Sequence, residues 1–580
     1  MASWANAKAT RSDLGRSARV GVLFLLLAFL LPAPGSDPRA ERPRVYAITG
    51  ATVVVSPGQV LEAGRIVLRD GLIEAVGAEI AIPPDAVEID GKGLWVYPGL
   101  IDALSSLGLK EEGGPPQSGS EGGAPGRPQR QSPSATSTGP GPVHSVARVH
   151  PEKLARDQIQ TFDDERKREM EKVRNLGFTT VNVVPRGGIF RGQSAVIHLA
   201  DDRPVSEMIV RDRAAQHVAF DRGRFGEGYP TSLMGAVAAI RQALLDAERH
   251  ATWLSRWQEN PAGLPRPESL PAFEALAPVL SGRQPIVFDL EDPWDFAVAD
   301  SLAGEFSLNA VLAASGHEWE IAPKVAAAGR WLILPVGPPD KPKVEDEGEA
   351  LDVPLKEMRR YLEFFRGPAI LREAGAKFVF TTRGLKNIAD FPKNFKKILD
   401  AGISEDALLA AWTTLPATLL GVDRLVGTLE AGKIADVVVS DGPLFQEKTK
   451  VKRVFVDGIE TRIEERKKPK GDPSAVVDPR GEWSVVLEFS GQSVSRTWTI
   501  TGKPGAYAGT AETRTGTVSF ERVDLEGNAL TVVLPPGERG GSAEATVIIT
   551  GDSFEGTVEM GPRTVPVKGT RAKGPEGGGR

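Results

Sequence analysis

The chain has 580 residues, of which 41% are hydrophobic and 25% are charged, an ordinary composition for a globular protein of several domains. The 76 acidic residues nearly balance the 70 basic ones, so nothing indicates the clustered basic surface that binds nucleic acid. The chain contains no cysteine, which excludes disulfide bonds and thiolate metal sites.

The first 36 residues have the pattern of an export signal. Arg11, Arg16 and Arg19 precede an apolar run at residues 20–31, and prolines and small residues follow that run. This order is typical of a cleaved signal peptide, and the run is shorter than the ~20 residues of a membrane span. We therefore expect residues 1–36 to be a signal peptide, and the mature chain to be a bacterial periplasmic or extracellular protein with no membrane association.

Two strand-rich pieces flank the middle of the chain. Residues 44–93 contain the hairpin turn Asp70-Gly71, and residues 422–463 contain a similar turn at Asp457-Gly458. The two pieces can join as one small composite β-sandwich.

The middle of the chain alternates apolar strand-like runs with amphipathic helices, the pattern of parallel βα units. So many units predict a TIM-like (β/α)8 barrel over residues 94–421, which makes the fold class α/β. Residues 110–142 interrupt it with a stretch rich in Gly, Pro, Ser and Gln that has no apolar period. We expect a disordered loop there, either a lid over the barrel mouth or a neutral insertion.

The last part of the chain changes in style again. After a polar linker at residues 464–479, residues 480–571 contain short strands separated by Gly and Asp turns. Their regular spacing predicts a separate antiparallel β-barrel or sandwich, followed by a disordered Gly-rich tail at residues 572–580.

Two motifs carry a resemblance to a known family. Residues 96–109 read VYPGLIDALSSLGL, and residues 427–439 read GTLEAGKIADVVV. Both resemble the amidohydrolase superfamily, in its imidazolonepropionase-like group, and the resemblance covers residues 44–465. It implies a barrel inserted in the composite β-domain, with zinc or another divalent metal at the barrel mouth. It also implies hydrolysis of non-peptide carbon–nitrogen bonds in cyclic amides, or sometimes of dipeptides.

The metal-binding positions of that family carry other residues here. Family members read Pro-Gly-Leu-Ile-Asp-x-His-x-His in the first motif, where this chain has Leu104 and Ser106 in place of the histidines. The resemblance places the remaining ligand positions at or near Asp289, Ala314 and Thr382. Apolar carbons and neutral hydroxyls are not usual zinc ligands. We therefore predict a degenerate metal site and no bound metal or other cofactor.

Other polar residues follow the predicted strands. Acidic residues after residue 288 can hold a hard cation through oxygen, or form a solvated loop. Arg186, Arg191 and Arg383 can bind a carboxylate bidentately, or pair with those acids. No two of the six histidines have the spacing that aims two imidazoles at one ion, so five are expected to be structural. The exception is His317, which follows a strand and opens a helix, and which can serve either the pocket or the start of that helix. The sequence assigns four residues to a candidate pocket, namely Asp102, Asp289, His317 and Arg383.

Three functions stay open on the sequence alone. The first is a hydrolase that works with a rebuilt, acid-rich or metal-free site. The second is a non-catalytic paralogue that binds a small ligand or pairs with an active amidohydrolase relative. The third gives the biological role to the C-terminal β-module. In each case we expect a small-molecule ligand or substrate and no nucleic acid, while homo-oligomerisation stays open.

Overall fold

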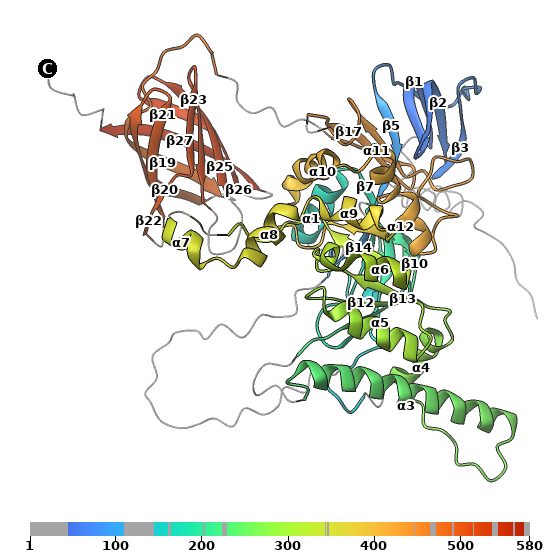
Figure 1. Cartoon of the computed structure of the whole chain (residues 1–580). Helices are drawn as coiled ribbons and strands as arrows, with labels where there is room; N and C mark the ends of the chain where they lie inside the picture. The colour runs from blue at the N-terminus through green and yellow to red at the C-terminus, as the bar shows by residue number, and fades with distance from the viewer. Residues whose placement is uncertain are drawn as a thin grey trace, which may run out of the picture. The chain divides into compact units, whose positions relative to one another are not determined.

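The predicted signal peptide at residues 1–36 and the predicted loop at residues 110–142 lie outside the described residues, as do residues 574–580 of the tail. In the part of the chain that the structure describes, none of the helices combines the length and apolar character that a membrane span requires. The computed structural model (Figure 1) describes residues 44–109, 144–160, 164–200, 203–222, 229–342, 344, 347–446, 448–463, 471–489, 492–513, 516–535, 543–560 and 563–573.

One eight-stranded sheet combines strands from the two pieces that flank the middle of the chain. The strand order is β18-β17-β16-β5-β1-β2-β3, and β4 pairs with β1. Both hairpin turns adopt the predicted geometry, with positive φ at Asp70-Gly71 and at Asp457-Gly458. The strands are β1 (Val45–Ser56), β2 (Gln59–Arg69), β3 (Leu72–Gly77), β4 (Val87–Asp90), β5 (Trp95–Pro98), β16 (Val437–Ser440), β17 (Val451–Val456) and β18 (Ile459–Arg462).

Two further sheets carry the βα part of the chain. In one, β6 (Leu100–Ser105) and β7 (Phe178–Val183) are parallel. In the other, five strands run parallel, and their residues are almost all buried, as the continuous apolar runs indicate. These five are β11 (Gln216–Ala219), β12 (Ile286–Asp289), β13 (Ala310–Ala313), β14 (Trp331–Pro335) and β15 (Lys377–Thr381). The predicted mixed α/β class is confirmed.

The arrangement between β7 and β11 differs from the predicted parallel repeat. Strands β8 (Phe190–Gln193) and β9 (Ala195–His198) follow each other with only Ser194 between them. Strand β9 pairs antiparallel with β7, β8 pairs antiparallel with β11, and the edge strand β10 (Ile209–Arg211) adds to β9. The connection after β7 spans only residues 184–189, whereas a parallel crossover needs about a dozen residues or more. The short connection therefore forces the chain to reverse.

Strands β6 and β15, the first and last of the βα part, lie against each other. The Thr381 hydroxyl donates a hydrogen bond to the Leu104 carbonyl, and the Thr382 N–H donates one of 3.2 Å to the Asp102 carboxylate. These contacts bring the carboxyl ends of β6 and β15 together.

Helices cover the outside of these strands. Helix α3 buries Ala236, Ala239, Ile240, Ala243 and Ala247 on one face, and the small side chains let it pack closely. The Ser232 hydroxyl caps its first turn by accepting the Gly235 N–H. The helices are α1 (Asp164–Arg174), α2 (Val205–Met208), α3 (Leu233–Glu259), α4 (Pro271–Leu280), α5 (Asp295–Glu305), α6 (Ala322–Ala328), α7 (Glu347–Asp352), α8 (Leu355–Glu363), α9 (Gly367–Glu373), α10 (Phe391–Asp400), α11 (Glu405–Ala410) and α12 (Thr414–Leu419).

The Pro98-Gly99 step of the first motif has a packing role. A Cβ atom at Gly99 would lie 2.1 Å from the Oγ1 atom of Thr179, which is fully buried and cannot move aside. We expect Gly99→Ala to lower the free energy of unfolding by ~1–3 kcal/mol through overpacking, measured by urea denaturation. The control is Gly304→Ala in α5, where an added Cβ meets nothing within 4 Å and stability should not fall. Equal effects of the two changes would contradict this packing role.

A buried ion pair links β9 to the residue that precedes β16. The Asp436 carboxylate lies 3.1 Å from Nδ1 of His198, and both side chains are almost fully buried. It also accepts hydrogen bonds from the Thr180 hydroxyl (3.0 Å) and the Asp457 N–H (2.9 Å). Asp436 belongs to the second sequence motif, so that motif is built into the core.

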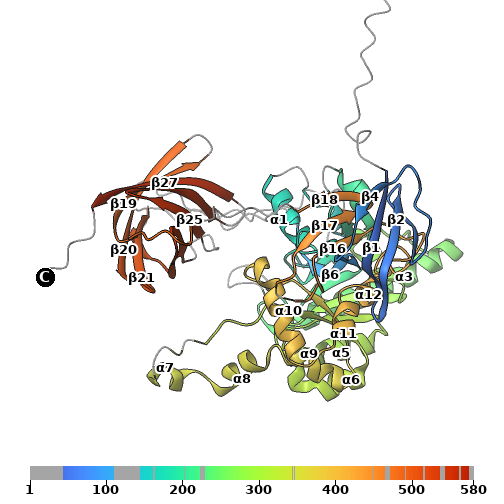
Figure 2. The same cartoon turned by 90° about the horizontal axis from the view of Figure 1, so that it is seen from above.

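The C-terminal segment forms a nine-stranded antiparallel sheet of order β22-β21-β20-β19-β27-β26-β25-β24-β23. The sheet is strongly curled (Figure 2), and β21 comes close to β23. Phe554 packs inside it against Trp483 and Trp498. The predicted antiparallel β-structure is therefore present. Its strands are β19 (Gly481–Phe489), β20 (Gln492–Lys503), β21 (Ala506–Thr513), β22 (Gly516–Ser519), β23 (Arg522–Glu526), β24 (Ala529–Leu534), β25 (Ala543–Thr550), β26 (Ser553–Met560) and β27 (Arg563–Lys573).

Candidate functional site

A pocket of about 240 Å³ opens at the carboxyl ends of β6, β7 and β12, where the resemblance places the metal site. Its wall is partly apolar, through Leu104, Val184 and Pro185. Among the described residues that line it, three are arginines and one is an acid. The full lining is Leu104, Ser105, Ser106, Val184, Pro185, Arg186, Gly187, Arg191, His217, Asp289 and Arg383.

Asp289 is held by two guanidinium groups in this pocket. Arg383 forms a bidentate pair with it, at 2.8 Å from Nη1 to Oδ1 and 2.7 Å from Nη2 to Oδ2, and Arg191 also bonds to Oδ2. Burial alone would raise the pKa of the Asp289 carboxyl, but the two arginines outweigh it and hold this pKa below its ordinary value. Asp289 is therefore an ionised carboxylate whose oxygens are both already engaged.

The residues at the family's metal positions do not fit a divalent ion. Leu104 offers only carbon, and the Ser106 hydroxyl accepts a hydrogen bond of 2.8 Å from Arg186. Ala314 and Thr382 come directly after β13 and β15 and do not line the pocket. None of these positions supplies a histidine, and the three arginines of the described lining are not metal ligands. Among the described residues, no group of three or more His, Asp or Glu side chains is placed to hold a metal.

His217 lines the pocket, although its place in the sequence predicts a structural histidine. It lies on β11, is 3% exposed and lines the pocket, and its Nε2 atom has no hydrogen-bond partner. Burial, reinforced by the charge of Arg191, lowers its pKa to about 3, so the ring is neutral. Strand β11 has only four residues, too few to show the alternation of apolar and polar residues that identifies a strand. Because the strand could not be predicted, the sequence did not show that His217 lies at the pocket.

Of the four predicted pocket residues, the structure brings Asp289 and Arg383 together. Asp102 is fully buried in β6 and faces away from the pocket lining, accepting hydrogen bonds from the N–H groups of Leu104 and Thr382 and from the Thr382 hydroxyl. Burial raises the pKa of its carboxyl despite these bonds. Asp102 therefore fixes the end of β15 against β6.

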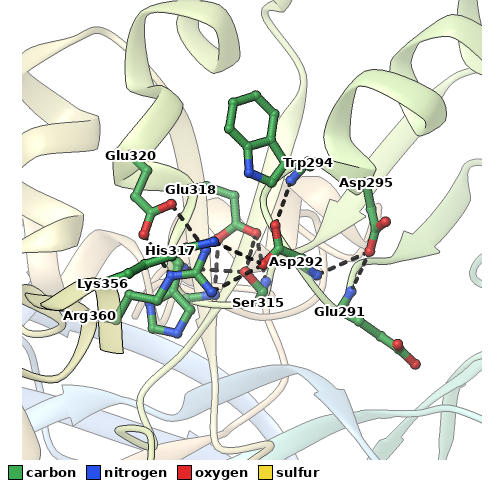
Figure 3. A network of polar contacts seen from close by, with 11 residues as sticks. Glu291, Asp292, Trp294, Asp295, Ser315, His317, Glu318, Glu320, Lys356 and Arg360 are labelled. Atoms are coloured by element: carbon green, nitrogen blue, oxygen red, sulfur yellow. Dashed lines mark hydrogen bonds and ion pairs between the residues drawn. The ribbon is translucent and has the colours of Figure 1, made fainter. Parts of the chain in front are cut away.

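His317 lies in a different polar network (Figure 3). Arg360 of α8 binds Glu320 at 2.6 Å and 3.0 Å, and it binds Asp292 at 3.1 Å. Burial, reinforced by the charge of Arg360, lowers the pKa of His317 to about 4. The structure therefore places His317 beside Arg360, Glu320 and Asp292, outside the described lining of the pocket that contains Asp289 and Arg383.

The acidic residues after β12 also form no cation site. The Asp295 carboxylate accepts the N–H groups of Glu291 and Asp292, and the Asp292 carboxylate pairs with Arg360 and accepts the Trp294 N–H (Figure 3). These carboxylates bind backbone and guanidinium donors at the start of α5, as acidic residues near a helix N-terminus do.

Comparisons with known proteins agree with the motifs. Residues 335–461, which include the second motif, match the family model described as "Amidohydrolase family". No curated protein matches the chain. Among solved structures, an amidohydrolase from Thermotoga maritima MSB8 is 24% identical, with 72% of this chain and 100% of that one covered and a TM-score of 0.58. Molinate hydrolase (16% identical, 72% and 95% covered, TM-score 0.41) and phenylurea hydrolase B (17%, 72% and 96%, 0.41) also align.

The family match and the Thermotoga maritima structure support the resemblance in different ways. The family model covers β15, the last strand of the βα part, and the motif that contains Asp436, while the structural similarity concerns the fold. Together they confirm the resemblance of this chain to the amidohydrolase superfamily.

Proposed function

We propose that this chain binds a small molecule in the arginine-lined pocket without a metal ion, as a non-catalytic relative of the amidohydrolases. The observation that carries the proposal is the bidentate pair between Arg383 and Asp289, completed by Arg191. The only carboxylate among the described lining residues is neutralised by guanidinium groups. Three arginines and one acid leave the described lining with an excess of two positive charges.

A second candidate function is metal-independent hydrolysis of a carbon–nitrogen bond. The family match and the unpartnered Nε2 atom of His217 favour it. However, a pKa of about 3 makes His217 a weak general base near neutral pH, since an efficient base has a pKa close to the working pH. Ligand binding is therefore the better-supported function.

Metal analysis of the purified full-length protein tests the proposal. We expect substoichiometric zinc, manganese and iron, because Leu104 and Ser106 cannot replace two histidines and Asp289 is engaged. A Leu104→His/Ser106→His variant should not gain tight zinc binding. The same variant with Arg191→Met and Arg383→Met, which frees Asp289 as a third ligand, serves as the comparison and should bind zinc more tightly.

The metal content of the wild-type protein decides whether the pocket works without a metal ion. A stoichiometric transition metal would overturn the proposal. Turnover of cyclic amides or dipeptides that is lost in a His217→Phe variant would favour the hydrolase instead.

The remaining sequence predictions belong to the same proposal. We propose export through the signal at residues 1–36. We also propose the division into a composite β-domain (44–93 with 422–463), a barrel (94–421) and a C-terminal β-domain (480–571). Self-association, or pairing with an active relative, would suit a non-catalytic paralogue.

A further inference from the structure

The charged residues that line the pocket indicate the class of ligand that it binds. This inference rests on the proposed function. Arg186, Arg191 and Arg383 line the pocket, and Asp289 is the single acid among the described lining residues. The described lining therefore carries an excess of two positive charges, since His217 is neutral. A pocket of this sign attracts anions and discriminates against cations.

Several donors in the pocket are not used by the protein. The Nε atom of Arg191 is buried and has no hydrogen-bond partner. Arg186 binds Ser106 through Nη2 alone, and its side chain is exposed and lines the pocket. The Nε2 atom of His217 is likewise buried, unpartnered and in the lining. A buried polar group without a partner costs free energy, which a ligand oxygen would recover.

One of the pocket arginines already binds a carboxylate. Asp289 occupies the fork of Arg383 with a carboxylate in bidentate geometry. Next to these donors, Leu104 and Val184 provide an apolar wall that would contact carbon rather than oxygen. An inorganic anion has no use for that wall, whereas an organic acid does.

We infer that the pocket binds a small organic dicarboxylate: one carboxylate meets the free donors of Arg186 and Arg191, His217 donates to a ligand oxygen, and the carbon chain lies on Leu104 and Val184. The second carboxylate interacts with the outer face of Arg383. Asp289 remains in place as the group that orients both of its arginines.

Calorimetric titration of the full-length protein with four probes tests this inference. Succinate should bind, and butyrate, which lacks one carboxylate, should bind at least about tenfold more weakly, because it loses a charge-assisted pair. Succinamide, which has the same shape without charge, should not bind. Inorganic phosphate should bind more weakly than succinate, because it cannot use the apolar wall.

Two variants and a control locate the binding site. Arg186→Met keeps an unbranched apolar side chain without the guanidinium group and should weaken succinate binding at least about tenfold. Asp289→Asn keeps the shape of the side chain and a carbonyl oxygen that can still orient an arginine, and it should strengthen succinate binding because the internal competitor for Arg383 loses its charge. Arg241→Met, which removes an exposed arginine paired with Glu305, should leave it unchanged.

The outcomes separate this inference from the proposed function. If phosphate binds as tightly as succinate, the pocket is a general anion site and the inference of a dicarboxylate ligand is overturned. No response to any anion, in a protein that is still free of metal, would overturn the inference alone. Stoichiometric metal in the wild-type protein would overturn the proposed function and this inference with it.

Discussion

An Asp436→Ala variant is expected to lose about 3–5 kcal/mol of unfolding free energy, because breaking a buried pair leaves an uncompensated charge. His198 would stay buried without its partner, and the Thr180 hydroxyl and Asp457 N–H would lose their acceptor. Equilibrium urea unfolding measures the loss. The control is Asp400→Ala, which removes an exposed aspartate paired only with Lys396 on α10 and should change stability by less than about 0.5 kcal/mol.

The same pair predicts a pH dependence. Burial opposes ionisation of both groups, but their mutual attraction raises the pKa of His198 above its ordinary value and lowers the pKa of Asp436 below its own. A raised histidine pKa adds stability below pH ~6.5 that is lost as the pH rises through the folded pKa. A lowered aspartate pKa adds stability above pH ~4 that is lost as the pH falls through the folded pKa.

The difference in stability between the wild type and Asp436→Asn should therefore be largest between pH ~4 and ~6.5 and shrink on both sides. Urea unfolding at a series of pH values measures this difference. A difference that does not change with pH would show that the pair is not ionised.

Replacing Trp412 with alanine is expected to cost about 3–5 kcal/mol. Its ring is fully buried, with ring centroids 5.2 Å from Phe178, 5.7 Å from Phe380 and 5.3 Å from Phe391. These partners come from β7, β15 and α10, so the cavity would separate three elements at once. Urea unfolding measures the effect, and Trp294→Ala is the control because Trp294 is 61% exposed.

A second substitution at Trp412 separates packing from polarity. The indole N–H of Trp412 is buried and has no hydrogen-bond partner. Trp412→Phe removes this group and keeps an aromatic ring, so it should cost much less than the alanine change. Equal losses for the two variants would mean that the aromatic cluster does not tolerate any repacking.

The strands of the βα part could be predicted because each is a short apolar run bounded by turn residues. Residues 286–289, 310–313 and 377–381 are strands where the sequence indicates them. The reversal at β8 and β9 was missed, although its cause is visible in the sequence. The six residues 184–189 are too few for a helical crossover, and they contain Gly187 and Gly188, both with positive φ.

The candidate site could be predicted only where a motif fixes the position. Leu104 and Ser106 follow from their spacing after Pro98-Gly99, and both line the pocket. The pairing of Asp289 with Arg191 and Arg383 was one of two alternatives, because the sequence does not say which charges meet across strands. The sequence does not reveal the neighbours of His317 for the same reason, since its environment depends on Arg360 from a separate helix.

The hydrogen bonds that hold Thr382 have a consequence for the speed of recognition. The N–H and hydroxyl of Thr382 are both tied to the buried Asp102, and Arg383 is the next residue along the chain. The backbone that carries this arginine is thus preorganised before any ligand arrives. Binding of a ligand to Arg383 does not have to order this backbone, so little conformational entropy is lost there. Association is therefore expected to be faster than in a site whose backbone must first rearrange.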